Sequence, residues 1–135
     1  MRLATRAWGE EGSPLAVLLH GLAASSLTWW RVGPWFAENG WRAVAVDLRG
    51  HGRSPRATHG LGLEDLAGDL HETVALLLGP EESVDVLLGH SLGALAASKL
   101  YRRHDRLAGR LVIEEPPASE NYDFNEVARM VWSRM

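Results

Sequence analysis

Short, continuous apolar runs recur along the chain, separated by stretches in which apolar residues return every three or four positions. The runs occupy residues 15–21 (LAVLLHG), 41–50 (WRAVAVDLRG), 83–90 (SVDVLLGH) and 110–117 (RLVIEEPP). Runs of this length that are apolar on both faces are typical of strands buried on both sides of a parallel sheet. The pattern therefore predicts four strands in a largely parallel sheet.

Helical periodicity fills the segments between these strands. Residues 63–78 carry leucines and a valine at three- and four-residue steps, and Gly79 then provides a stop signal. Residues 26–40 form a less regular pattern, which predicts a helix broken or bent near Pro34. Residues 91–104 predict a third helix, whose small residues permit close approach to the sheet.

Alternation of strands and helices predicts an α/β fold with helices on both faces of the sheet. We expect residues 1–118 to form the N-terminal part of a domain with this α/β fold. One more helix is predicted over the closing segment, residues 119–135. Its apolar residues Phe124, Val127, Met130 and Val131 would fall on one side of that helix.

Composition limits the ligands and the chemistry. The 135 residues suffice for one domain, and the net charge of −3 indicates no basic face for nucleic acid or an anionic membrane. The absence of cysteine excludes disulfides, thiolate catalysis and cysteine-based zinc sites. No spacing of histidines and carboxylates indicates a metal site, and no motif indicates a nucleotide cofactor. Small molecules or proteins remain as ligands, and we expect no cofactor.

No stretch of the chain predicts a targeting or membrane segment. The first fourteen residues, MRLATRAWGEEGSP, lack the apolar core of a secretion signal. No apolar run approaches the roughly 18 residues that a membrane-spanning helix needs. We therefore expect a cytoplasmic protein with no membrane partner.

One pentapeptide carries candidate chemistry: Gly89, His90, Ser91, Leu92 and Gly93. It lies where a predicted strand ends and a helix begins, which is the context of a nucleophile elbow. In so tight a turn, a side chain at either glycine would collide with the strand or the helix. The serine hydroxyl would stand above the sheet at the positive end of the helix. Ser91 is therefore the candidate nucleophile.

Together with two other landmarks, the elbow resembles the α/β-hydrolase family. The first landmark is LLHGLAASSLTWW (18–30), and the second is DLRGHGRS (47–54). The resemblance implies the family's three-layer fold and an oxyanion hole formed by the backbone N–H groups of Leu22 and Leu92. Gly21 belongs to the same loop. We interpret His20 as a strand-end residue that hydrogen-bonds its own loop.

The resemblance also implies a triad in the order serine, acid, histidine, and this chain departs from it. After Ser91 the only histidine is His104, about 20 Å away at the far end of the predicted helix. Glu114 and Glu115 lie near where some members place the acid, but we expect them to be solvated or bound to loop groups. We expect His51 to be a solvated turn residue, and His59 and His71 to lie on the surface.

The simplest hypothesis is a serine hydrolase truncated after its N-terminal half, which acts on an ester or related acyl substrate through an acyl-enzyme at Ser91. Residues 1–118 would then be the N-terminal part of an α/β-hydrolase domain, and residues 119–135 the start of its lid helix. Serine disfavours the chemistry of dehalogenases and epoxide hydrolases, which resemble one another in using aspartate there. Haloperoxidase-like and carbon–carbon-hydrolysing members remain alternatives. A further alternative is a non-catalytic half-fold that binds a second copy, or complements a C-terminal half, through the uncovered strand edge at 110–115.

Overall fold

A computed structural model describes residues 1–57, 59–60, 62–80 and 82–116 of this protein. Within them, one sheet contains β1 (Thr5–Trp8), β2 (Leu15–Leu19), β3 (Arg42–Val46), β4 (Val84–His90) and β5 (Ala108–Glu114). The strand order is β1-β3-β2-β4-β5. β1 is antiparallel to β3, and the other neighbouring pairs are parallel. The predicted, mainly parallel sheet is confirmed.

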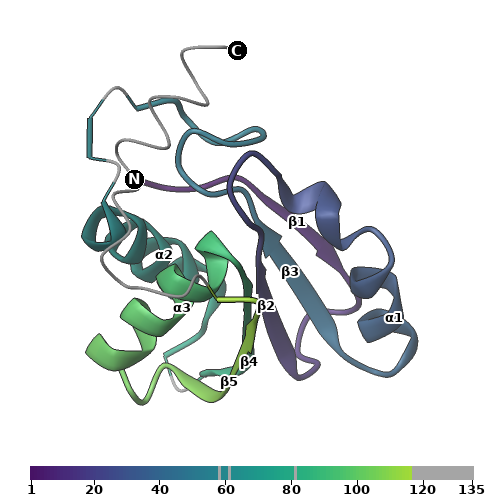
Figure 1. The fold of residues 1–135 in the computed structure, drawn as a ribbon. Helices are drawn as coiled ribbons and strands as arrows, with labels where there is room; N and C mark the ends of the chain where they lie inside the picture. The colour runs from purple at the N-terminus through teal and green to yellow at the C-terminus, as the bar shows by residue number, and fades with distance from the viewer. Residues whose placement is uncertain (58, 61, 81, 117–135) are drawn as a thin grey trace.

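Helices cover both faces of this sheet (Figure 1). One side carries α2 (Leu63–Leu77) and α3 (Leu92–Arg103), while the other carries the 3-10 helix η1 (Ser26–Trp29) and α1 (Val32–Glu38). The arrangement is therefore the three-layer α/β fold that the sequence predicts.

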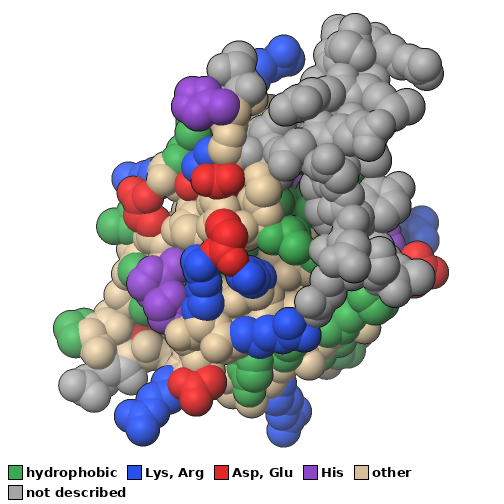
Figure 2. All heavy atoms as spheres, turned by 60° about the vertical axis from the view of Figure 1, so that its left-hand side comes forward, with side chains coloured by type: hydrophobic (Ala, Val, Ile, Leu, Met, Phe, Trp, Pro, Cys, Tyr) green, Lys and Arg blue, Asp and Glu red, His purple; other side chains and the backbone are tan. Residues whose placement is uncertain are grey.

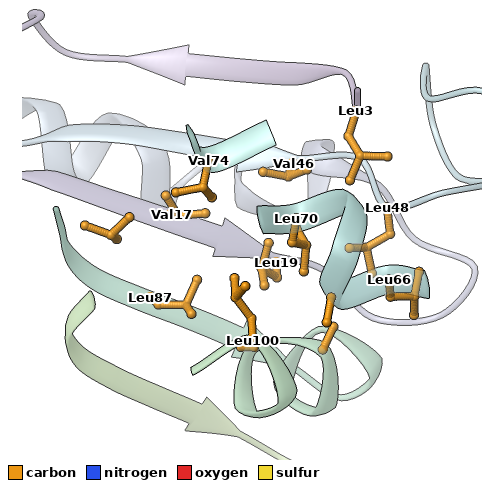
Figure 3. Packing of buried hydrophobic residues seen from close by; sticks show 14 of the residues in the cluster. Leu3, Val17, Leu19, Val46, Leu48, Leu66, Leu70, Val74, Leu87 and Leu100 are labelled. Atoms are coloured by element: carbon orange, nitrogen blue, oxygen red, sulfur yellow. The ribbon is translucent and has the colours of Figure 1, made fainter. Parts of the chain in front are cut away.

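Alternation along β2 divides the core into two layers. Val17 and Leu19 pack with residues of α2 and α3, and Figure 3 shows both side chains pointing into the layer that also contains Leu70 and Leu100. Leu18 belongs to the opposite layer, which contains Trp29 and Ala45. Because successive strand side chains point to opposite faces, a continuous apolar run fills both layers. This explains why β2 is buried along its entire length.

Two elements differ from the sequence prediction. β1 was not predicted, because its four residues carry no continuous apolar run and are mostly half-buried. The helix predicted over 26–40 is interrupted at Trp30–Arg31, between η1 and α1, rather than near Pro34. Pro34 is the third residue of α1. Backbone N–H groups in the first turn of a helix have no acceptor within the helix, so the N–H that proline lacks costs no helical hydrogen bond there.

β5 is an edge strand in the described part of the chain, because β4 is its only neighbour there. Most of its residues are exposed, including Val112 at 41% and Ile113 at 36%. The strand begins two residues earlier than the predicted run at 110. The helix predicted over 119–135 lies outside the described residues, and so does the end of the segment 1–118.

The outward surface of α2 and α3 is polar. Figure 2 brings this side forward and shows acidic, basic and histidine side chains beside one another. Glu64 of α2 pairs with Lys99 and Arg103 of α3. Among the described residues, no helix is long and apolar enough to cross a membrane.

Candidate active site

Ser91 occupies a sharp turn between the last residue of β4 and the first residue of α3. Its φ of 52° and ψ of −114° lie outside the regions that L-residues normally adopt, at a cost of about 1–3 kcal/mol. The Ser91 N–H donates to the Glu114 carbonyl of neighbouring β5 at 3.0 Å, and the Ser91 carbonyl accepts from the Ala94 N–H at 3.0 Å. The strained conformation is thus held from both sides.

Both glycines of the pentapeptide are required by backbone contacts. A Cβ on Gly89 would lie 2.3 Å from the Gly93 carbonyl oxygen in α3. A Cβ on Gly93 would lie 2.3 Å from the Leu19 carbonyl oxygen at the end of β2. Neither obstacle is a flexible side chain, so neither can move aside. These are the steric reasons that the sequence predicts for the two glycines.

The loop after β2 lies directly against the elbow. A Cβ on Gly21 would approach Ser91 Cβ to 3.3 Å and His90 Nδ1 to 3.2 Å. In the described structure, the backbone N–H groups of Leu22 and Leu92 donate no hydrogen bond. Leu92 also opens α3, whose N-terminal end favours negative charge. The two amides that the family resemblance implies for an oxyanion hole are therefore unpaired donors on segments that flank Ser91.

His20 connects this loop to the end of β3. Its ring is fully buried, its Nδ1 donates to the Gly21 carbonyl at 2.7 Å, and its Nε2 accepts from the Leu48 N–H at 3.0 Å. Burial lowers the pKa of His20 from 6.5 to about 4. At neutral pH the ring is therefore uncharged and hydrogen-bonds its own loop.

His51 differs from the prediction of a solvated turn residue. It is only 5% exposed, and its ring lies 5.0 Å from the His20 ring. Nε2 accepts from the Ala23 N–H at 3.2 Å, and Nδ1 donates to the Arg49 carbonyl at 2.9 Å. Burial lowers the pKa of His51. The prediction was wrong because the loops after β2 and β3 pack together, which local sequence does not reveal.

Asp47 ties the same loops together. Its carboxylate accepts from the Ser26 N–H at 2.6 Å and from the Arg53 N–H at 3.1 Å. Burial disfavours the charged carboxylate, but these backbone hydrogen bonds outweigh it and hold the pKa below 3.8. Ser54 adds a hydrogen bond from its hydroxyl to the Asp47 carbonyl at 2.5 Å.

Arg49 and Asp69 form a partly buried ion pair that the sequence patterns did not predict. The guanidinium binds both carboxylate oxygens, at 2.6 and 2.8 Å, and also donates to the Gly60 carbonyl at 2.7 Å. The N-terminal amino group of Met1 contacts Asp69 at 3.0 Å. One signal was available: Asp69 precedes Leu70 on the apolar side of α2, where a carboxylate needs a partner.

The structure brings no histidine to Ser91. Among the described residues, none is hydrogen-bonded to the Ser91 hydroxyl. His104 caps the far end of α3, where its ring stacks on His71 with centroids 3.9 Å apart. His90 Nε2 lies 3.3 Å from Glu115 Oε2, which agrees with the expectation that this glutamate binds a nearby group.

The described residues contain no group of three or more potential metal ligands among histidine, cysteine, aspartate and glutamate. The strand ends therefore present a serine in a strained turn, two unpaired amides and two uncharged histidines that support the loops. Such an arrangement can attack a carbonyl carbon and stabilise the resulting oxyanion, provided that a base is supplied.

Comparisons with known proteins identify relatives. A family model described as alpha/beta hydrolase fold matches residues 14–135. The chain is 37% identical over 112 residues to epoxide hydrolase B of Mycobacterium tuberculosis, covering 79% of this chain and 30% of that protein. It is 33% identical over 112 residues to the bifunctional esterase/perhydrolase DCH of Acinetobacter calcoaceticus, covering 82% of this chain and 40% of the relative.

A solved structure described as a marine microorganism esterase superposes with a TM-score of 0.78 at 26% sequence identity. The match covers 99% of this chain and 51% of the esterase. The chain thus spans between about a third and a half of the length of these relatives.

Proposed function

Because the chain belongs to the alpha/beta hydrolase fold family, we propose that it supplies the nucleophile and the oxyanion hole of a serine hydrolase acting on an ester or related acyl substrate. The observation that carries this proposal is the strained backbone of Ser91 between β4 and α3, with the Gly21 loop packed against it. Strain of this kind persists only where the surrounding structure enforces it, and it is concentrated at functional sites.

The reaction follows from the positions of the donors. Ser91 Oγ attacks the carbonyl carbon of the substrate and loses its proton to a base, while the carbonyl oxygen becomes an oxyanion. The Leu22 and Leu92 N–H groups donate to that oxyanion. The C–O bond to the leaving group then breaks, the leaving group takes up a proton, and an acyl-enzyme remains on Ser91. Water hydrolyses this ester and regenerates the hydroxyl.

Serine also distinguishes among the activities named for the relatives. A serine that opened an epoxide would form an ether, which water does not hydrolyse under mild conditions. A serine that attacks an acyl carbon forms an ester, which water does hydrolyse. Ser91 therefore supports the acyl chemistry of the esterase relative rather than the activity named for epoxide hydrolase B.

We assign the base to a histidine other than the six in this chain. All six lie within the described residues, and none is hydrogen-bonded to Ser91 Oγ. His104 is held at the far end of α3, and the Nε2 of His90 faces Glu115. A segment or a separate chain that places an imidazole above the elbow would complete the proton transfer.

A fluorophosphonate probe tests this proposal, because covalent capture of a serine requires an activated hydroxyl. The 135-residue chain is incubated with the probe alone, and again with the C-terminal half of the esterase relative. Peptide mass spectrometry then locates the adduct, with Ser91→Ala as the control. We expect capture at Ser91 only in the complemented sample. Capture by the isolated chain would contradict the external base, and no capture in either sample would contradict the acyl-enzyme.

The edge of β5, which pairs with no strand other than β4 in the described part of the chain, favours a second candidate, in which the chain binds a second copy of itself. In an antiparallel pair centred on Val112, Arg110 of one copy would face Glu114 of the other, and Leu111 would face Ile113. The segment is therefore complementary to itself in both charge and apolar pattern, and Val112 and Ile113 are exposed. Exposed apolar edge strands readily pair with other strands.

Analytical ultracentrifugation over a range of concentrations tests this candidate. We expect the wild-type chain to dimerise and Val112→Lys to remain monomeric, since two lysines would meet at the centre of the pair. Leu76→Lys is the matched control, because Leu76 is 60% exposed but lies on α2, away from the edge. A monomeric wild-type chain, or equal dimerisation of Val112→Lys, would contradict pairing through β5.

A further inference from the structure

The turn that carries Leu22 contains an alanine in an unfavourable conformation. Ala23 has a φ of 59°, in the left-handed region that residues with a Cβ rarely adopt. The Ala24 N–H closes the turn on the Gly21 carbonyl at 3.3 Å. Gly21 packs against Ser91, so the turn lies beside the candidate nucleophile. Because the Ala23 conformation is unfavourable, other contacts must hold the turn in this shape.

Two histidines fix the peptide planes on either side of Leu22. The Gly21 carbonyl and the Leu22 N–H belong to one planar peptide unit, and His20 Nδ1 donates to that carbonyl at 2.7 Å. The Leu22 carbonyl and the Ala23 N–H belong to the next unit, and that N–H donates to His51 Nε2 at 3.2 Å. The Leu22 N–H lies in the first plane, and the Leu22 φ and ψ angles couple that plane to the second, which His51 holds.

The surroundings of His51 fix its tautomer. The Arg49 carbonyl, 2.9 Å from Nδ1, can only accept a hydrogen bond, so Nδ1 must carry the proton. The lone pair is then on Nε2, where the Ala23 N–H approaches. With only 5% of the residue exposed, little water can replace the ring as the acceptor for Ala23.

We propose that His51 is a positioning residue, which holds the Gly21–Ala24 turn through the Ala23 N–H and so directs the Leu22 amide toward the substrate oxyanion. This proposal rests on the proposed function, since it takes Ser91 as the nucleophile and Leu22 as an oxyanion donor. Only the uncharged form of the His51 ring can hold the turn, because a protonated ring has no lone pair to accept from the Ala23 N–H.

The groups around His51 determine when it becomes charged. The His20 ring lies 5.0 Å away and is uncharged at neutral pH, and the Asp47 carboxylate is the nearby negative charge. The Arg49 guanidinium is engaged with Asp69. Burial is the largest influence and lowers the pKa of His51, so the ring stays neutral to a lower pH than an exposed histidine does. Acidification that protonates this ring is expected to release the turn.

A matched pair of variants separates the two hydrogen bonds of the ring. His51→Gln can place an oxygen acceptor near the position of Nε2, whereas His51→Asn can place a donor near the position of Nδ1 and offers no acceptor to Ala23. Hydrogen exchange of the Ala23 amide is followed by NMR in the 135-residue chain, with the Val17 amide in the buried strand β2 as the control for global unfolding.

We expect exchange at Ala23 to become about tenfold faster in His51→Asn and to change little in His51→Gln, with Val17 unaffected. In the wild type, the protection of Ala23 relative to its intrinsic exchange rate should fall as His51 titrates, while His51→Gln should show no such step. Equal protection of Ala23 in the wild type and in His51→Asn would overturn the proposal.

Fluorophosphonate capture in the complemented sample distinguishes this proposal from the proposed function. If His51 positions the turn, capture at Ser91 slows in His51→Asn and recovers in His51→Gln. Equal capture rates in all three proteins would overturn the positioning role while leaving the nucleophile intact. No capture in the wild type would refute the proposed function, and with it a role in catalysis for His51, whatever Ala23 exchange shows.

Discussion

Acidification from pH 7 to pH 5 is predicted to destabilise the fold through His20. Its ring is fully buried, Nδ1 donates to the Gly21 carbonyl, and Nε2 accepts from the Leu48 N–H. A proton added at Nε2 would break the second bond and place a charge in the interior. Burial accordingly lowers the pKa of His20 from 6.5 to about 4.

The lowered pKa fixes the sign and the size of the effect. Between pH 6.5 and pH 4 the unfolded chain binds a proton at His20 and the folded chain does not, so stability is lost as the pH falls through this window. With these two pKa values, linkage lowers the free energy of unfolding by about 2 kcal/mol between pH 7 and pH 5, and by about 3 kcal/mol between pH 7 and pH 4. The pKa of Asp47 lies below 3.8, so this carboxylate contributes only in more acidic solution.

Urea unfolding at pH 7, 6 and 5, followed by tryptophan fluorescence, measures this loss. His20→Gln retains an acceptor for the Leu48 N–H but does not titrate, so it should be less stable than the wild type at pH 7 and lose about 2 kcal/mol less by pH 5. His59→Gln is the control, because it removes a histidine from an exposed position. If His20→Gln kept the full pH dependence of the wild type, the assignment to His20 would be wrong.

Further substitutions test the packing, the backbone strain and the ion pair near the site. Gly93→Ala should prevent stable folding, because the new Cβ would lie 2.3 Å from the Leu19 carbonyl oxygen. Gly68→Ala in α2 is the matched control, since no atom lies within 4 Å of its new Cβ. It should raise the free energy of unfolding in urea by about 0.5–1 kcal/mol. Ser91→Gly should raise stability by about 1 kcal/mol by calorimetry, since φ is 52°, and a Ser91→Ala variant with the same gain would contradict the strain. Asp69→Asn should cost about 2 kcal/mol in urea unfolding by leaving the partly buried Arg49 guanidinium without its carboxylate, and a loss below about 1 kcal/mol would show that the pair is not needed.

The parts of the fold that could be predicted from the sequence are those with a strong local pattern. β2 is apolar at every position, and α2 repeats leucine at helical spacing, so their positions follow from periodicity alone. β1 has four residues and is stabilised by pairing with β3, which no local pattern records. The interruption at Trp30–Arg31 likewise depends on how η1 packs against the sheet.

In the candidate site, too, some residues could be predicted from local sequence and others could not. Ser91 and its glycines could be found because they form one short, contiguous sequence motif at the junction of a strand and a helix. The role of His51 could not, because it depends on contact between loops that are 28 residues apart in sequence. Asp69 also lies 20 residues from its partner Arg49. An aspartate on the apolar side of a helix indicates that a partner exists, but not which residue it is.

The register of the sheet explains why these distant residues meet. Leu19 at the end of β2 lies opposite Val46 of β3 and Gly89 of β4, so the three strands end at the same level. The segments that follow then emerge side by side, and buried polar groups and two strained residues, Ala23 and Ser91, concentrate there. Each of these features costs stability, and the hydrogen bonds between the loops offset part of the loss. A loop held by uncharged histidine rings keeps its amides directed without adding a positive charge beside Ser91. If Ser91 is the nucleophile, the local stability lost at the strand ends is therefore the expected consequence of keeping the Leu22 amide in place.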